Sequence, residues 1–311
     1  MYVVMYHYVR KIKHSRYTGI KGLELDLFEQ QILFFLKKGY RFVTLENILN
    51  KKNIDSKSVL LTFDDGYLDH FLNVFPILMK YHISGVFSMP GKIIREKKVL
   101  DVNKIHFILA EATIDIVKER LFERMDYYRG REFPLLSNQE LYDKAAVAER
   151  FDDKDTIFVK RMLQVELPER LRFLITDELF KEFVTQDEDA FVDELYMNMN
   201  QINLMKSAGM EFAIHGYDHY WMNRLTEIEL CNDINAALNV FDGIVPNKNW
   251  CFCYPYGSCN DTVIATAKEN GCTSGLSTEV AIYLPDSMDV FRIPRLDTND
   301  FPPKSENYIS M

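Results

Sequence analysis

The sequence has few cysteines, no long apolar stretch and no excess of positive charge. It has only five cysteines, Cys231, Cys251, Cys253, Cys259 and Cys272, without the paired spacing of a metal site, so we expect reduced thiols of a cytoplasmic protein. No apolar stretch approaches the roughly 20 residues of a membrane span. The net charge of -9 argues against a nucleic-acid partner, which requires a basic surface.

The composition is that of a folded protein. A hydrophobic content of 47% in 311 residues is enough for one large α/β domain or two smaller ones. The first nine residues lack the basic head of a secretion signal, and His7 interrupts them. We therefore expect a first core strand here and a cytoplasmic location.

Apolar runs and amphipathic segments alternate along both flanks of the chain. Strands are expected at 1–9, 40–44, 59–63, 84–89, 210–214, 250–253, 272–276 and 290–293, with helices at 26–38, 45–49, 69–81, 201–207, 226–241 and 262–270. Such alternation predicts a parallel sheet with helices packed outside it, formed by residues 1–90 and 201–311.

Residues 91–200 have a different pattern, which predicts a helical insertion. Ile105 to Ile116 and Ile157 to Val165 show helical spacing, and Pro168 is placed to open a third helix. The insertion can serve packing and formation of a homodimer, or it can select substrate. For the second role the best candidates are Tyr127, Tyr128, Arg129 and Arg131.

Polar residues follow three of the expected strands, at the edge where parallel strands place their carboxyl ends. These residues are Asp64-Asp65-Gly66, the pair His215 and His219, and the turn Pro255-Tyr256-Gly257. One carboxylate and two imidazoles suit a divalent ion such as Zn²⁺, and the second aspartate can then act as a base. The alternative is structural, because Asp-Gly also forms turns and helix caps and a single histidine is usually a core residue.

The same segments resemble the polysaccharide deacetylases of carbohydrate esterase family 4. Thr62-Phe63-Asp64-Asp65-Gly66 is similar to the first motif of that family, and Tyr254-Pro255-Tyr256-Gly257 to the third. His215-Gly216-Tyr217-Asp218-His219 resembles the second motif, with Gly216 in place of Ser or Thr. Met5-Tyr6-His7-Tyr8-Val9 resembles the Tyr-His start of the branch that acts on biofilm exopolysaccharides.

The resemblance implies a distorted (β/α) barrel of about seven parallel strands and hydrolysis of the N-acetyl group of an amino sugar. It further implies that Asp65, His215 and His219 hold the metal ion, most simply Zn²⁺, and that Asp64 is the general base. The backbone N–H of Tyr256 would stabilise the oxyanion.

Two elements of the family pattern are absent. The arginine that often precedes the third motif is replaced in Trp250-Cys251-Phe252-Cys253, and no histidine follows His219 in a Leu-x-His. We hypothesise that His7 serves as the acid and that Arg292 or Arg295 supplies the positive charge, the alternatives being a structural histidine and surface arginines.

The expected function is metal-dependent deacetylation of an N-acetylated sugar or oligosaccharide, in a glycan or a glycan precursor. Two alternatives remain open at this point. The chain can be a catalytically lapsed glycan-binding or assembly protein that kept the pocket, or a hydrolase of another amide C–N bond.

Overall fold

The structure is a computed structural model that describes residues 1–148 and 152–310. The chain forms two compact units, which we call unit 1 and unit 2. Unit 1 comprises Met1–Lys11, Gly22–Lys98 and Val192–Met311, and unit 2 comprises Ile12–Lys21 and Val99–Phe191. Unit 2 therefore takes in a short segment near the N-terminus that the sequence pattern did not single out.

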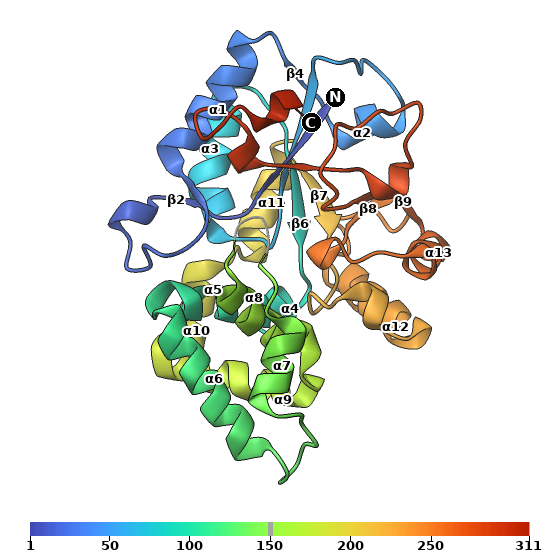
Figure 1. The fold of residues 1–311 in the computed structure, drawn as a ribbon. Coiled ribbons are helices and arrows are strands. Elements are labelled where there is room, and N and C mark those ends of the chain that lie inside the picture. The colour runs from blue at the N-terminus through green and yellow to red at the C-terminus, as the bar shows by residue number, and fades with distance from the viewer. Residues whose placement is uncertain (149–151, 311) are drawn as a thin grey trace. The chain divides into compact units, whose positions relative to one another are not determined.

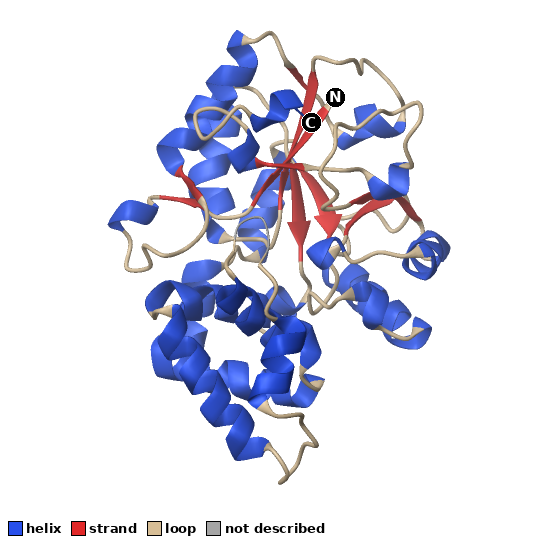
Figure 2. Ribbon diagram, viewed as in Figure 1, coloured by secondary structure: helices blue, strands red, loops and turns tan. Residues whose placement is uncertain are grey.

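Unit 1 is built on a curled parallel sheet, drawn in red in Figure 2 with helices outside it. Within the described residues, seven strands follow one another in the order β10-β1-β5-β6-β7-β8-β9, and β4 pairs with β5 beside this path. A separate pair joins β2 to β3. The predicted distorted (β/α) barrel of about seven parallel strands is thus confirmed, and the sheet is curled into a half-barrel. The strands are β1 (Tyr2–Tyr6), β2 (Val9–Arg10), β3 (Leu23–Glu24), β4 (Arg41–Phe42), β5 (Ser58–Phe63), β6 (Val86–Met89), β7 (Glu211–Ile214), β8 (Trp250–Cys253), β9 (Cys272–Leu276) and β10 (Leu296–Asp297).

The central strands are apolar because both of their faces are covered, as is typical of parallel sheets. Every residue of β5, β6 and β8 is buried. Aromatic rings of neighbouring strands also pack against one another. Phe63 of β5 stacks on Tyr6 of β1, with 5.1 Å between ring centroids, and on Phe87 of β6, with 4.8 Å. Tyr6 and Phe63 are the last residues of β1 and β5, so the candidate site begins directly beyond these rings.

Helices α1, α3, α4, α11, α12 and α13 lie outside the sheet in Figure 1. The predicted helix over 69–81 begins with a π-helical turn, His70–Val74, and only then becomes α3. Pro76 lies in the first turn of α3, directly after the π-helical turn. The helices of unit 1 are α1 (Leu25–Lys37), α2 (Leu45–Leu49), α3 (Phe75–Lys80), α4 (Lys92–Arg95), α11 (Met199–Ser207), α12 (Glu227–Val240) and α13 (Asp261–Glu269), with α10 (Glu188–Leu195) leading in from unit 2.

The strand predicted at 290–293 is wrong. Residues Val290–Arg292 form a 3-10 turn, which Asp289 caps by accepting a hydrogen bond from the N–H of Phe291. The last strand is β10, which follows Pro294 and pairs with β1. Of the four residues only Ile293 is fully buried, and the capping aspartate decides the local conformation of the other three.

Unit 2 is helical, and it consists of α5 (Asp101–Glu111), α6 (Ile114–Tyr128), α7 (Asn138–Ala145), α8 (Lys154–Arg161), α9 (Glu169–Phe183) and short irregular segments. The single helix expected from Ile105 to Ile116 is interrupted between α5 and α6, whereas α9 does begin after Pro168. The ammonium of Lys104 lies buried at 3.1 Å from both Asp177 and Glu188, so this buried charge is paired. In the part of the chain that is described, no helix combines the length and apolarity required to cross a bilayer.

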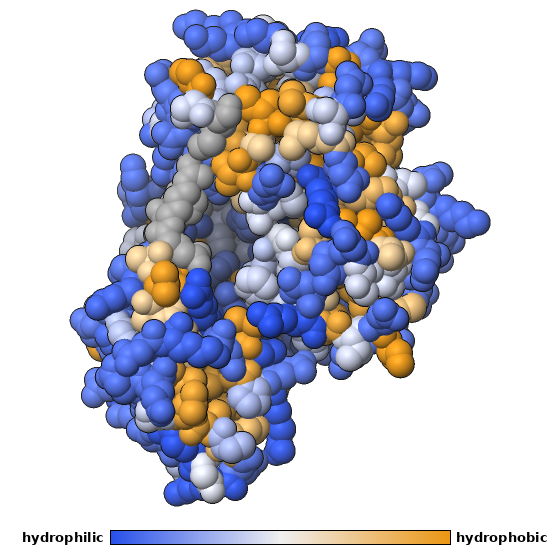
Figure 3. Space-filling view, turned by 45° about the vertical axis from the view of Figure 1, so that its right-hand side comes forward, coloured by the Kyte–Doolittle hydropathy of each residue, from blue (hydrophilic) through white to orange (hydrophobic). Residues whose placement is uncertain are grey.

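The four candidate substrate residues of unit 2 lie at the end of α6. Tyr128 donates to Glu178, and Arg129 binds Asp126 and Asn138, so these two serve contacts inside the unit. Tyr127 is exposed, with the guanidinium of Arg131 over its ring. In Figure 3, hydrophobic residues form separate clusters among hydrophilic ones on the face shown.

Candidate metal and catalytic site

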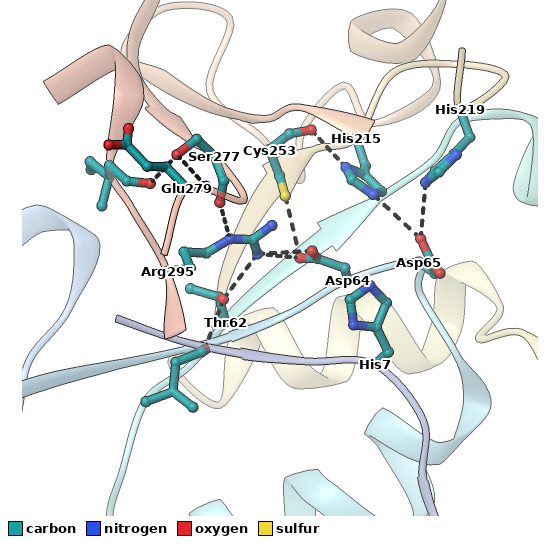
Figure 4. A network of polar contacts seen from close by, with 12 residues as sticks. His7, Thr62, Asp64, Asp65, His215, His219, Cys253, Ser277, Glu279 and Arg295 are labelled. Carbon is teal, nitrogen blue, oxygen red and sulfur yellow. Dashed lines mark hydrogen bonds and ion pairs between the residues drawn. The ribbon is translucent and has the colours of Figure 1, made fainter. Parts of the chain in front are cut away.

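The polar residues predicted at the strand ends lie together in unit 1 (Figure 4). His7 follows β1, Asp64 and Asp65 follow β5, and His215 follows β7. Because these three strands run parallel within one sheet, residues far apart in the sequence meet beyond their carboxyl ends.

Asp65, His215 and His219 form a compact buried cluster. The Asp65 Oδ1 atom is 3.3 Å from Nε2 of His215 and 3.4 Å from Nε2 of His219. The three candidate ligand atoms all lie within 4.8 Å of one another. In a tetrahedral zinc site with bonds of about 2.0 Å, neighbouring ligand atoms are about 3.3 Å apart. The observed donor set therefore fits a small divalent ion in both chemistry and spacing.

The hydrogen bonding of the imidazoles also fits metal ligation. Nδ1 of His215 donates to the carbonyl oxygen of Cys253 at 2.6 Å, which directs Nε2 toward Asp65. A backbone acceptor on one ring nitrogen is the usual way in which proteins fix the ligating nitrogen of a histidine. Burial lowers the pKa of His219, which favours its neutral, ligating form.

The cluster attracts positive charge. Burial works to raise the pKa of Asp65, but the hydrogen bonds of His215 and His219 outweigh it and lower that pKa well below its usual value. Burial works to lower the pKa of His215, whereas the neighbouring Cys253 and Asp65 raise it well above normal. Asp65 therefore stays ionised and offers a full negative charge to a cation.

Three of the predicted site residues have a left-handed backbone, with φ of 72° at Asp65, 56° at His219 and 57° at Tyr256. This conformation is uncommon for residues other than glycine, and it concentrates at functional sites because the surrounding fold must enforce it. The motif letters alone do not reveal it.

Asp233 of α12, which the sequence analysis missed, holds the loop between the two histidines. Its Oδ1 accepts from the N–H of Tyr217 at 2.8 Å and its Oδ2 from the N–H of Asp218 at 3.2 Å. Burial raises the pKa of Asp233 to about 6. The only sequence signal for this role is an acid on the inward face of an amphipathic helix.

Gly216 has a steric reason to depart from the Ser or Thr of the related motif. Its φ is +69°, and a Cβ atom there would lie 2.4 Å from Met222 Cε and 2.9 Å from Asp233 Oδ1. The space that a side chain would occupy is thus already filled by Met222 and Asp233.

We expect Gly216→Ser to lower the free energy of unfolding by about 1–3 kcal/mol, because it adds overpacking to a positive φ. Gly209→Ser is the matched control, since Gly209 also has a positive φ (+90°) but nothing within 4 Å of its Cβ position. Urea unfolding of both variants separates the two effects. Equal losses in the two variants would show that Met222 and Asp233 yield without cost.

Asp64 is held by an arginine from the end of the chain. Nη1 of Arg295 lies 2.9 Å from Oδ1 of Asp64 and 2.8 Å from Oδ2, and it donates to the hydroxyl of Thr62 at 3.1 Å. Both side chains are almost fully buried, at 1% and 2% exposure. Burial works to raise the pKa of Asp64, but the charges of Arg295 and His215 lower it below its usual value.

The structure thus distinguishes the two arginines considered from the sequence. Arg295 contacts Asp64, whereas Arg292 is 42% exposed and pairs with Asp261 instead. The positive charge beside Asp64 therefore comes from a segment after β9 and not from the strand before the third motif.

Cys253 also contacts Asp64: its thiol donates a hydrogen bond from Sγ to Oδ1 at 3.3 Å. Asp64, His215 and Cys253 also offer three possible metal-ligand atoms that all lie within 4.8 Å of one another. This group is a poor ligand set, however, because Arg295 already binds both oxygens of Asp64 and Nδ1 of His215 is bonded to the Cys253 carbonyl. We therefore assign the thiol to packing and hydrogen bonding around Asp64.

His7 lies next to Asp64 and Asp65 in Figure 4, and its charge contributes to the lowered pKa of both. Its backbone carbonyl accepts a hydrogen bond from Nε2 of His70 at 2.9 Å. Burial lowers the pKa of His70 to about 4, so His70 is a neutral support for the His7 backbone.

Tyr256 lies in the 3-10 turn Pro255–Gly257 that follows β8. Its ring meets the edge of His219 at 4.6 Å between centroids and stacks on Trp221 at 4.6 Å. The turn therefore borders the ligand cluster, and its aromatic pair covers one side of His219.

The fold and site together define an α/β half-barrel with a buried acid–imidazole cluster beyond its strand ends. The family model for polysaccharide deacetylase matches residues 171–275, which include both histidines and Tyr256 but not the two aspartates. The protein named "Putative polysaccharide deacetylase YxkH" from Bacillus subtilis (strain 168) is 34% identical over 74 residues, 22% of this chain and 26% of that protein. The matched part is thus about a quarter of that relative's length.

Solved structures match the fold over nearly the whole chain. The Streptococcus pyogenes deacetylase PplD, solved with acetate, aligns with a TM-score of 0.59 and 16% identity over 100% of this chain and 96% of its own. IcaB from Ammonifex degensii aligns with a TM-score of 0.57 and 18% identity over 99% and 94%. The chain is thus similar to polysaccharide deacetylases over residues 171–275, and it shares the fold of these solved deacetylase structures over nearly its whole length.

Proposed function

We propose that the chain is a metal-dependent deacetylase that hydrolyses the N-acetyl group of an amino sugar in a glycan or glycan precursor. One observation carries this proposal. The Asp65, His215 and His219 cluster has the spacing of a metal site, and a second carboxylate, Asp64, is held beside it by Arg295. A protein that only bound a metal would have no need for that second, separately anchored carboxylate.

Each residue then has a distinct task in hydrolysis. A divalent ion held by Asp65, His215 and His219 would acidify a water molecule and polarise the acetyl carbonyl. Asp64 accepts the proton of the attacking water, and Arg295 keeps its carboxylate ionised and oriented. The backbone N–H of Tyr256 donates a hydrogen bond to the oxyanion, which forms on the carbonyl oxygen of the acetyl group as water attacks. His7 gives a proton to the departing amine, and acetate and the free amino sugar leave.

The proposed substrate class rests on the similarity to polysaccharide deacetylases. We also propose a cytoplasmic location, in which case an intracellular sugar precursor would be the substrate.

The proposal is tested by metal analysis of the purified protein combined with acetate release from N-acetylated sugars, nucleotide sugars and oligosaccharides. We expect acetate release that a chelator abolishes and that added Zn²⁺ restores. Bound metal without turnover on any substrate would favour a glycan-binding protein, and release of another product from another amide would favour a different hydrolase.

A further inference from the structure

The two carboxylate oxygens of Asp65 have different surroundings. Oδ1 faces the Nε2 atoms of His215 and His219, whereas Oδ2 accepts a hydrogen bond from the hydroxyl of Tyr67 at 2.5 Å. Tyr67 comes directly after the Asp-Asp-Gly motif, and no role was expected for it from the sequence. The hydroxyl of Tyr67 therefore orients the Asp65 carboxylate together with the two histidines.

The backbone places Tyr67 in this position. Asp65 and Gly66 both have a left-handed backbone, with φ of 72° and 69°, so the chain turns sharply after β5. A Cβ atom at Gly66 would lie 2.7 Å from Met89 Cε and 2.9 Å from Ile93 Cδ1, so the turn packs closely against its surroundings.

A second segment of unit 1 fixes the turn from the other side. The N–H of Met197 donates to the carbonyl oxygen of Gly66 at 3.0 Å, and Tyr196 forms an antiparallel bridge with Tyr67. The turn at the metal ligand is therefore fastened to the chain that leads from α10 to α11.

The ring of Tyr67 is fully buried and has little freedom to move. It stacks on the ring of Tyr8, with 4.0 Å between centroids, and lies nearly parallel to Tyr196 at 6.2 Å and 8°. A phenol immobilised in this way holds its hydroxyl at a fixed point, which is what a precise hydrogen bond to a metal ligand requires.

We propose that Tyr67 is a positioning residue of the metal site: its hydroxyl holds Oδ2 of Asp65, so that Oδ1 alone is offered to the ion. This inference rests on the proposed metal-dependent function. It assigns a task to Tyr8 and Tyr196 as well, because their rings hold the phenol in place.

The test compares Tyr67→Phe with Tyr6→Phe. Tyr6 is an equally buried phenol of the same unit, but its hydroxyl donates to Gln31, away from the cluster. Affinity for Zn²⁺ is measured by competition with a chelator, and the visible spectrum of the Co²⁺-loaded protein reports the coordination geometry. We expect Tyr67→Phe to bind Zn²⁺ about 10–100-fold more weakly and to change the Co²⁺ spectrum. Tyr6→Phe should leave both unchanged, whatever its effect on stability.

The outcomes separate this inference from the proposed function. If the wild type binds Zn²⁺, Asp65→Asn does not, and Tyr67→Phe matches the wild type in affinity and spectrum, the role of Tyr67 is refuted and the metal site stands. If the wild type binds no divalent ion, or if Asp65→Asn binds as tightly as the wild type, the metal-dependent function itself fails. Equal losses in Tyr67→Phe and Tyr6→Phe would mean that the effect is one of stability only.

Discussion

Asp64→Asn is expected to lower the turnover number for acetate release by about 10²–10⁴-fold, the usual contribution of a general base. Asparagine has nearly the shape of aspartate but cannot accept the proton of the attacking water. The metal content should remain that of the wild type, because the ligand cluster is formed by Asp65, His215 and His219. Turnover and metal content are measured on the same preparation.

Asp65→Asn is the matched control, because it changes the neighbouring carboxylate in the same way. This variant should lose metal and activity together, whereas Asp64→Asn should lose activity alone. Asparagine at position 64 also leaves the buried guanidinium of Arg295 without its counter-charge, so thermal unfolding must show that the variant is folded at the assay temperature. Undiminished turnover in folded Asp64→Asn would remove Asp64 from the mechanism.

The sequence predicts the parallel sheet and the composition of the candidate ligand cluster because both depend on local patterns, whereas the barrel form was implied by the family resemblance. Apolar runs followed by Asp-Asp-Gly or by His-Gly identify strands that end at a polar edge, and parallel topology brings those ends together. The structure accordingly places Asp65, His215 and His219 within reach of one ion.

The residues that hold the site in place could not be predicted in the same way, because their roles depend on contacts over long sequence separations. Arg292 and Arg295 lie three positions apart, yet only Arg295 reaches Asp64, because Arg292 is in a 3-10 turn at the surface. Asp233 and Tyr67 have no motif of their own. Their tasks become visible only when α12 and the turn after β5 are seen beside the histidines.

The support of Asp64 also explains how the chain dispenses with the arginine that often precedes the third motif. Cys253 stands close to Asp64 on β8, and a thiol carries no positive charge to hold a carboxylate. Arg295 supplies that charge from the segment between β9 and β10, where its Nε also donates to the carbonyl oxygen of Ser277 at 2.8 Å. The same electrostatic task is therefore performed from a different strand end.

Arg295→Met should lower the free energy of unfolding by about 3–5 kcal/mol, because it leaves the buried carboxylate of Asp64 without its partner. Arg292→Met is the matched control: its partner Asp261 is fully exposed, and a pair of this kind contributes only about 0–1 kcal/mol. Urea unfolding of the two variants gives the comparison directly.

The double variant Arg295→Met/Asp64→Asn tests whether the cost arises from the unpaired charge. With a neutral side chain at position 64, the unpaired carboxylate that Arg295→Met leaves is removed, so the double variant should be more stable than Arg295→Met alone. Arg295→Lys keeps the charge but loses the guanidinium, in which Nη1 binds Asp64 and Thr62 while Nε donates to Ser277, so its stability should lie between the wild type and Arg295→Met. If the two arginine-to-methionine variants were equally stable, the pair would not anchor Asp64, and the proposed base would need another source of orientation.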